Sequence, residues 1–157
     1  MKYSSILLQS SKNKKINTQK IKLLSKIDKH LIDEKIHTLH HQVFQTIDCL
    51  QCANCCKTTS PIITNRDVER ISKYLKIKPG VFTEHYLMID EDEDYIFKNT
   101  PCSFLNIENN ECSIYEVRPK ACAEYPHTNR KNMNEIFRLT LKNTLICPAV
   151  AHIFEKL

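Results

Sequence analysis

The stretch Cys49-Leu50-Gln51-Cys52-Ala53-Asn54-Cys55-Cys56 places four thiols within eight residues, with the spacing C-x2-C-x2-C-C. Thiols at this density have no packing rationale as unligated core residues, whereas their spacing suits a soft metal ion. The rest of the chain adds four more cysteines. The candidate metal ligands are therefore Cys49, Cys52, Cys55, Cys56, Cys102, Cys112, Cys122 and Cys147.

The spacing alone does not choose between zinc and iron. Zinc sites use cysteine pairs two to four residues apart, and iron–sulfur clusters use C-x2-C-x2-C with a remote fourth cysteine that can precede proline, as Cys147-Pro148 does here. Two four-thiolate zinc sites, or one 4Fe-4S cluster with four thiols left over, both remain open. Side chains of neighbours in extended backbone point to opposite sides, so we expect Cys55 and Cys56 not to share an ion.

The composition indicates a small reduced protein that depends on its metal. A chain of 157 residues is expected to form one domain with a modest core. A structural zinc site can supply ~10–16 kcal/mol, which is comparable to the stability of such a domain. The apolar run Ile6-Leu7-Leu8 is too short for a signal peptide, and no stretch reaches the length of a membrane span. Clustered cysteines then favour a cytoplasmic metal protein over a disulfide scaffold.

The positive charge lies at the N-terminus. Residues 1–30 hold eight lysines and one acidic residue, a net +7, so the remaining residues carry −2 of the total +5. A lysine-rich arm can bind nucleic acid, but this one has no arginine and a single aromatic residue, which weakens that interpretation. We expect residues 1–15 to be a disordered basic tail and residues 16–157 to form the cysteine-cluster domain.

Hydrophobic periodicity predicts an α+β fold that is mostly helical, with a long N-terminal helical segment and a short β-hairpin. Residues 17–47 lack proline and glycine, and they carry two apolar stripes that face different ways, so a bend or two helices are expected. The first stripe is Ile16, Leu23, Leu24, Ile27 and Leu31. The second is Ile32, Ile36, Leu39, Val43 and Ile47.

Local signals divide the rest of the chain. Thr64 or Asn65 can cap a helix that ends near Pro79-Gly80, and a short helix is expected over 81–88. Strands are expected at 95–98, 102–107 and 112–115, the last two joined as a hairpin by residues 108–111. Residues 136–146 can be strand or helix, and Cys147-Pro148 opens a final helix. A regular hairpin would hold Cys102 and Cys112 roughly 17 Å apart, too far to share one ion.

Other polar groups offer no catalytic constellation. His30, Glu34, His37 and His41 share one helical face, but a di-iron site needs a second Glu-x-x-His, so a solvated face is the better interpretation. The acidic run 90–94 lacks the glycine and the glutamate of a calcium loop. His127 is read as a loop residue, and Arg118 is expected to bind carbonyls or a carboxylate near the site. The sequence therefore favours a non-enzymatic protein.

The ordered set of motifs resembles a known family. Cys49-x2-Cys52-x2-Cys55-Cys56 is followed by Pro101-Cys102-Ser103-Phe104-Leu105, by the segment from Cys112 to Cys122, by Tyr125-Pro126 and by Cys147-Pro148. Residues 47–157 are in this respect similar to the bacterial cysteine-cluster (CxxCxxCC, or YkgJ-type) family of zinc- or iron-chelating domains. The resemblance implies a metal-chelating role for the eight cysteines and carries little mechanism.

Two hypotheses follow. The leading one is a metal-binding protein that holds zinc or iron through clustered thiolates. The rival is an iron–sulfur redox protein, or an accessory component of a modification enzyme, because flagellin lysine methylases contain a similar cluster.

Overall fold

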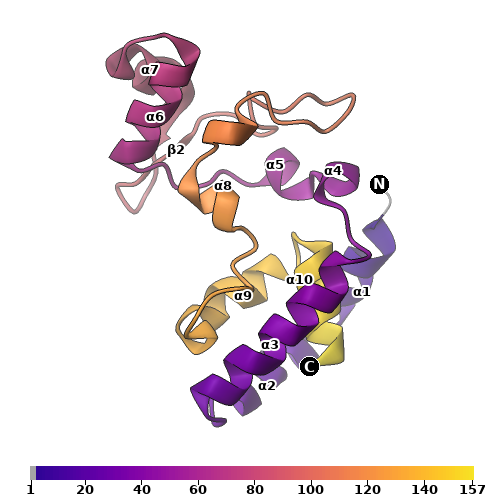
Figure 1. Ribbon diagram of the computed structural model, residues 1–157. Helices are drawn as coiled ribbons and strands as arrows, with labels where there is room; N and C mark the ends of the chain where they lie inside the picture. Colours follow the sequence, from indigo (N-terminus) through magenta and orange to yellow (C-terminus); the bar gives the residue numbers. More distant parts are fainter. Residues whose placement is uncertain (1–2) are drawn as a thin grey trace. The chain divides into compact units, whose positions relative to one another are not determined.

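A computed structural model describes residues 3–157, and the chain divides into two compact units. Unit 1 contains residues up to Cys52 together with Pro126–Leu157, and unit 2 contains Ala53–Tyr125. The described residues form ten α-helices, two short 3-10 helices and one two-stranded antiparallel hairpin (Figure 1). The predicted class, mostly helical with a short hairpin and a helical N-terminal segment, is confirmed.

Unit 1 is a bundle of helices. Its N-terminal part holds α1 (Ser4–Lys12), α2 (Lys14–Leu24), α3 (Lys29–Phe44) and the single turn α4 (Cys49–Cys52). Its C-terminal part holds the 3-10 helix η2 (Met133–Ile136), α9 (Phe137–Asn143) and α10 (Pro148–Lys156). The segment around residue 25 therefore forms two helices, and Asp28 caps the second by accepting a 2.9 Å hydrogen bond from the His30 N–H.

The core of unit 1 forms where α3 packs against α10. The second predicted stripe faces this core, with Ile32, Ile36, Val43 and Ile47 buried and Leu39 half-buried. Helix α10 contributes Ala149, Val150, Ile153 and Phe154, and η2 contributes Met133. The prediction that Cys147-Pro148 opens the last helix is confirmed, because Pro148 occupies its first turn, where a missing N–H costs nothing.

The first predicted stripe is wrong. Ile16, Leu23, Ile27 and Leu31 are all about half exposed or more, and only Leu24 of that set is buried. The prediction treated residues 16–31 as one continuous helix. Helix α2 ends at Leu24 and α3 begins at Lys29, so residues before and after this break do not share one helical face. Helix α2 instead buries Asn17 and Leu24.

Unit 2 holds α5 (Asn54–Thr58), α6 (Asn65–Leu75), α7 (Pro79–Tyr86), β1 (Leu87–Ile89), β2 (Tyr95–Phe97), the 3-10 helix η1 (Tyr115–Val117) and α8 (Lys120–Glu124). The predicted cap of α6 is confirmed. The Thr64 hydroxyl accepts from the Asp67 N–H, while the Asp67 carboxylate accepts from the Thr64 N–H at 2.9 Å, which is a capping box. The helix ends earlier than expected, at Lys76 in the left-handed region.

The predicted hairpin at 102–115 is wrong, and the hairpin lies elsewhere. Strands β1 and β2 pair from Leu87 opposite Phe97 to Ile89 opposite Tyr95, around the acidic turn. Between 102 and 115 only an isolated bridge joins Leu105 to Cys112. The reason is local turns: the Leu105 N–H donates to the Cys102 carbonyl at 3.0 Å and the Tyr115 N–H donates to the Cys112 carbonyl at 3.1 Å, so both predicted strands bend away from a ladder. The expected 17 Å separation of Cys102 from Cys112 therefore does not apply.

An aromatic core holds unit 2 together. Phe104 lies against Tyr86, Phe97 and Phe82, with ring centroids 4.9, 5.5 and 6.4 Å apart. Two cysteines, Cys102 and Cys112, pack against this core. Cys102 lies two residues before Phe104 in the chain, and Cys112 pairs with the residue after it, Leu105. Burial of these rings therefore anchors the segment that carries two of the cysteines.

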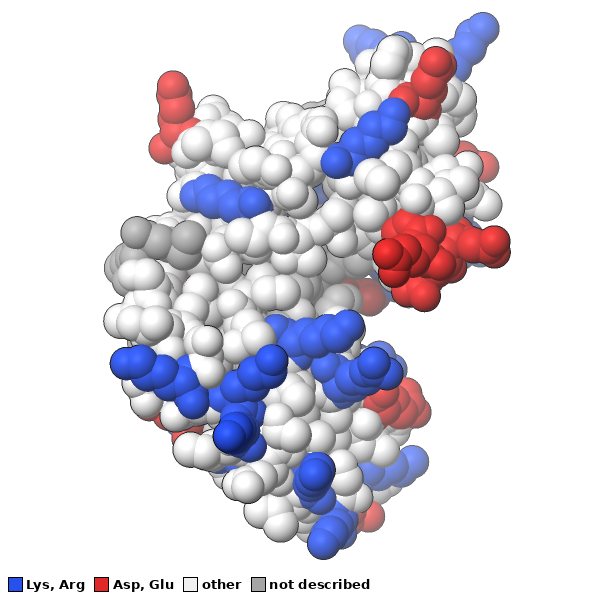
Figure 2. Space-filling model, turned by 180° about the vertical axis from the view of Figure 1, so that it is seen from behind, with Lys and Arg blue, Asp and Glu red and all other residues white. Residues whose placement is uncertain are grey.

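The distribution of charged side chains over the surface reflects their positions in the sequence. Figure 2 shows lysine and arginine side chains scattered over the surface and one compact group of acidic side chains. The longest acidic run of the sequence, residues 90–94, connects β1 to β2 in unit 2. Helix α1 covers most of the segment 1–15 that we expected to be a disordered basic tail. Whether this segment is disordered in solution stays a prediction. Over residues 3–157 no helix is long and apolar enough to span a bilayer.

Candidate metal centre

All eight cysteines are present as thiols, and they fall into one set in each unit. Unit 2 holds Cys55, Cys56, Cys102, Cys112 and Cys122, and unit 1 holds Cys49, Cys52 and Cys147. The dense stretch is thus split, because the boundary between the units falls between Cys52 and Ala53, whose φ of 47° turns the backbone sharply. Each set is described by itself.

Backbone contacts bring the cysteines of unit 2 together. The Cys102 N–H donates a 2.8 Å hydrogen bond to the Cys56 carbonyl, so α5 lies beside the segment that follows β2. The bridge between Leu105 and Cys112 brings the segment that contains Cys112 beside the segment that contains Cys102. Cys122 comes from α8, which Pro119 opens.

Cys56 ionises more readily than Cys102, Cys112 and Cys122. A contact of 4.0 Å between the sulfurs of Cys55 and Cys56 stabilises the Cys56 thiolate and outweighs partial burial, and the nearby Lys57 charge adds to the effect. Together these lower the pKa of Cys56 to about 7. A thiol with this pKa is about half ionised at neutral pH and is ready to bind a cation.

Three thiols of unit 2, Cys102, Cys112 and Cys122, resist ionisation. Burial raises the pKa of Cys102, Cys112 and Cys122, and for Cys122 the value reaches about 12. Repulsion between thiolates acts in the same direction as burial. The charge of Cys56 raises all three pKa values, and those of Cys102 and Cys112 add to the effect at Cys122. Four thiolates this close are unstable without a cation, and a divalent cation between them would reverse the effect.

Several groups already favour the thiolate form in this set. The N–H groups of Phe104 and Leu105 stabilise the Cys102 thiolate, and the Ile114 N–H stabilises that of Cys112. The positive charge of Arg118 lowers the pKa of Cys112 and Cys122 and so favours their thiolates. Hydrogen bonds of this kind support ligands around a bound metal.

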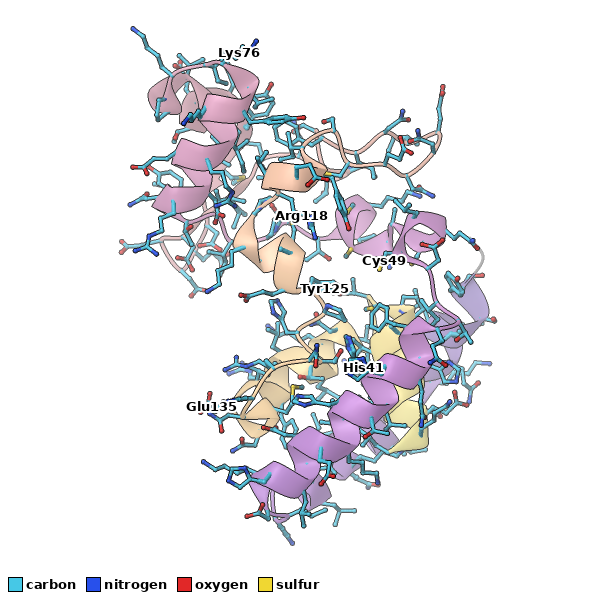
Figure 3. All side chains as sticks on the ribbon, in the orientation of Figure 1. His41, Cys49, Lys76, Arg118, Tyr125 and Glu135 are labelled. Atoms are coloured by element: carbon cyan, nitrogen blue, oxygen red, sulfur yellow. The ribbon has the colours of Figure 1, made fainter. Side chains whose placement is uncertain are left out.

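Arg118 is held in place as the sequence suggested. Its guanidinium donates a 2.7 Å hydrogen bond to the Tyr115 carbonyl and lies 3.9 Å from the centre of the Tyr115 ring (Figure 3). Lys57, by contrast, was not singled out by sequence reasoning. It donates to Asn110 Oδ1 at 2.6 Å, and the signal available in the sequence was its place directly after Cys56.

Cys55 and Cys56 do not lie in extended backbone, so the premise that separated them is wrong. Both belong to helix α5, and their sulfurs are 4.0 Å apart. This is close to the ~3.8 Å edge of a tetrahedron with Zn–S bonds of ~2.3 Å. Neighbouring thiols in this helix can therefore approach one ion.

The set in unit 1 combines one helical turn with one helix N-terminus. Cys49 and Cys52 lie three residues apart on α4, and Cys147 is the N-cap residue of α10. Burial raises the pKa of Cys147 to about 12, the N–H groups of Val150 and Ala149 act against this, and the charges of Cys49 and Cys52 raise it further. The charges of Cys49 and Cys52 therefore act on the Cys147 thiol.

The thiols do not yet surround a common point. Over residues 3–157 no group of three or more histidine, cysteine or carboxylate side chains is placed so that it could hold a metal ion as it stands. The chemistry of the donors fits zinc or iron, because thiolates are the ligands these metals take in closed sites. Metal binding in either set would therefore require side chains to turn inward.

The histidines of α3 take part in packing contacts. His37 Nε2 lies 2.7 Å from the Arg130 carbonyl, and His40 Nδ1 lies 2.8 Å from the Thr128 hydroxyl. His30, Glu34 and His41 are exposed, so the solvated-face interpretation holds for them. His127 lies outside the helices, in the segment that follows α8, with a φ of 64°.

Comparison with known proteins identifies the family. Residues 48–144 match the CxxCxxCC family, which is described as "Putative zinc- or iron-chelating domain". The uncharacterised protein MJ0661 of Methanocaldococcus jannaschii is 30% identical over 82 residues, which cover 51% of this chain and 44% of that protein. The chain thus matches less than half the length of this relative. No solved structure matches the chain. The family match covers more than half of the residues, and the chain belongs to the CxxCxxCC family.

Proposed function

We propose that this protein chelates zinc or iron through clustered cysteine thiolates, with Cys56, Cys102, Cys112 and Cys122 as the ligands of a site in unit 2. The observation that carries the proposal is geometric: a 2.8 Å hydrogen bond joins the Cys102 N–H to the Cys56 carbonyl, and a bridge brings the Cys112 segment beside the same stretch. In keeping with this, the charge of Cys56 raises the pKa of Cys102, Cys112 and Cys122. Removal of this repulsion by a divalent cation couples metal binding to deprotonation of the whole set.

The surroundings support ligation by all four residues. Cys56 supplies the first thiolate, because its pKa is about 7, and the other three are partly buried around it. Arg118 and the N–H groups of Phe104 and Ile114 face the developing negative charge. Four thiolate ligands would leave a tetrahedral ion no open position, which suits a structural or storage role better than catalysis.

Cys55 has a supporting role in this proposal. Its thiol lies against Cys56 and stabilises the thiolate there. Replacement of Cys55 should weaken metal binding without abolishing it, whereas replacement of a ligand should abolish it.

The experiment is metal and sulfide analysis of protein purified without oxygen. We expect bound zinc or iron, no binding at the unit 2 site in Cys122→Ser, and full metal content in the control Lys14→Ala, whose side chain is exposed in unit 1. Acid-labile sulfide and a brown colour would identify an iron–sulfur cluster, the rival hypothesis. Full metal content in Cys122→Ser would refute the proposed site.

A further inference from the structure

We infer that a polar cavity in unit 1, between α1, α2 and α10, binds a small organic ammonium compound that carries a hydrogen-bonding group on a short chain. No cysteine lines this cavity. The inference therefore goes beyond the proposed function and is independent of it, so that either can fail without the other.

The cavity is large enough for an organic molecule. Its volume is about 200 Å³. A single water needs roughly 10–15 Å³ of such space, so the cavity has room for several heavy atoms. Six polar residues and two apolar ones, Ile6 and Ala151, line it. The polar residues are Ser5, Gln9, Ser10, Asn13, Asn17 and Glu155.

The backbone places the polar side chains of α1 and α2 on one side. The Asn13 N–H donates to the Gln9 carbonyl at 3.0 Å, and the Asn17 N–H donates to the Asn13 carbonyl at 2.8 Å. Helical hydrogen bonds therefore continue across the junction of the two helices, and residues spaced four apart lie along one face. Gln9, Asn13 and Asn17 have this spacing.

The burial pattern of these helices departs from that of an ordinary core. Ser10 is the buried residue of α1 and is 6% exposed, whereas Leu8 of the same helix is 61% exposed. In α2, Asn17 is 5% exposed. Burial of a hydroxyl or an amide has a cost unless a hydrogen bond compensates it. Polar residues at buried positions, against the local pattern, are typical of functional sites.

Protein groups satisfy these two buried side chains incompletely. Within residues 3–157 the Asn17 side chain makes one hydrogen bond, from Nδ2 to Ser10 Oγ at 3.5 Å. This length exceeds the usual ~2.7–3.2 Å of an N–H···O bond, so the bond is weak. An amide offers two N–H donors and a carbonyl acceptor. The Asn17 amide can therefore bind a polar group in the cavity.

Glu155 determines the charge of the ligand. Its side chain is exposed in the last turn of α10, and it takes part in none of the ion pairs found among residues 3–157. The Lys20 ammonium donates to the backbone carbonyls of Phe154 and Glu155, at 2.5 and 3.4 Å. None of the described lining residues is basic, and the C-terminal end of a helix favours positive charge. An ammonium group beside the Glu155 carboxylate therefore fits this cavity, and an anion does not.

The test compares three probes of equal chain length and different charge: ethanolamine, ethylene glycol and glycolate. Each is titrated into the isotope-labelled full-length protein as purified, and the backbone and side-chain amide signals are followed by NMR. We expect ethanolamine to shift the Asn13 and Asn17 signals in a saturable way. It should bind about tenfold more tightly than ethylene glycol, because a hydrogen bond to a charged group is the stronger one. Glycolate should not bind.

Two variants and a matched control locate the site. Glu155→Gln should lower the affinity for ethanolamine by about tenfold and remove its advantage over ethylene glycol. Ser10→Ala, at the buried side of the cavity, should weaken both of these probes. Glu34→Gln changes an exposed glutamate of α3 that does not line the cavity, and it should bind all three probes as the wild type does. Circular dichroism checks that each variant keeps its helix content.

The outcomes separate a ligand site from a hydrated surface cavity. Tighter binding of glycolate, equal binding of the three probes, or unchanged ethanolamine affinity in Glu155→Gln would overturn the inference. Absence of a saturable shift with any probe would overturn it as well, because the cavity would then hold water only. None of these results bears on metal chelation by the cysteines.

Discussion

The N–H of Cys102 donates a 2.8 Å hydrogen bond to the carbonyl of Cys56, and so joins the end of the dense cysteine stretch to the first of the distal cysteines. The bond is formed by backbone atoms, so it does not depend on the state of either thiol. It fixes the two chain segments side by side while the sulfurs remain able to turn. We therefore expect metal binding to order side chains around a backbone that is already in place.

The adjacent cysteines of α5 should differ in effect. Cys56→Ser should lose the metal of unit 2, because it removes a ligand, whereas Cys55→Ala should keep the stoichiometry and lose affinity by about 10–100-fold, as loss of a supporting hydrogen bond does. Competition with a chromophoric zinc chelator measures both. Equal loss of metal in the two variants would make Cys55 a ligand as well.

The capping box of α6 predicts a stability effect away from the thiols. Asp67 is almost fully buried, accepts from the Arg70 guanidinium at 2.5 Å and from the Lys120 N–H at 3.0 Å, and closes the cap with Thr64. Asp67→Ala should reduce the free energy of unfolding by about 1–3 kcal/mol, because it removes the cap and leaves donors unpaired. Urea unfolding of the metal-loaded protein measures the loss. Glu91→Ala, at an exposed position, is the control and should change stability by less than about 0.5 kcal/mol.

The lowered pKa of Asp67 predicts how the stability of the protein depends on pH. Burial opposes ionisation of Asp67, but the hydrogen bonds from Thr64, Arg70 and Lys120 outweigh it and hold its pKa below the usual range. The unfolded chain then binds a proton more readily than the folded one, so this contribution is present above pH ~4 and is lost as the pH falls through the folded pKa. Asp67→Asn should flatten this part of the stability profile. A profile unchanged by Asp67→Asn would contradict the assignment.

The parts of this fold that could be predicted from the sequence are those that depend on residues close together in the chain. Thr64 and Asp67 form their capping box within four residues, and Pro148 starts α10 by its own ring geometry. The hairpin could not be placed, because the N–H groups of Leu105 and Tyr115 donate to carbonyls three residues back, and these turns bend both segments where an alternating pattern predicts a ladder. The grouping of the cysteines depends on contacts between distant segments, such as that of Cys102 with Cys56, which no spacing rule contains.

The carboxylate of Asp33 on α3 binds the backbone at the start of η2 in unit 1. Asp33 accepts hydrogen bonds of 2.7 and 2.8 Å from the N–H groups of Asn132 and Met133. Asp33→Ala should cost about 1.5–3 kcal/mol, the range for hydrogen bonds to a charged group, and should raise amide exchange at both residues. Glu34→Ala, next to it on the exposed face, should do neither. Unchanged exchange at Met133 in Asp33→Ala would show that the contact does not hold in solution.

The most direct test of the account is X-ray absorption at the metal edge of protein purified without oxygen. If thiolates hold the metal, sulfur atoms at ~2.3 Å will dominate its first coordination shell, and Cys122→Ser will lose part of that signal. A first shell of nitrogen and oxygen alone, or protein without zinc or iron, would contradict the central claim.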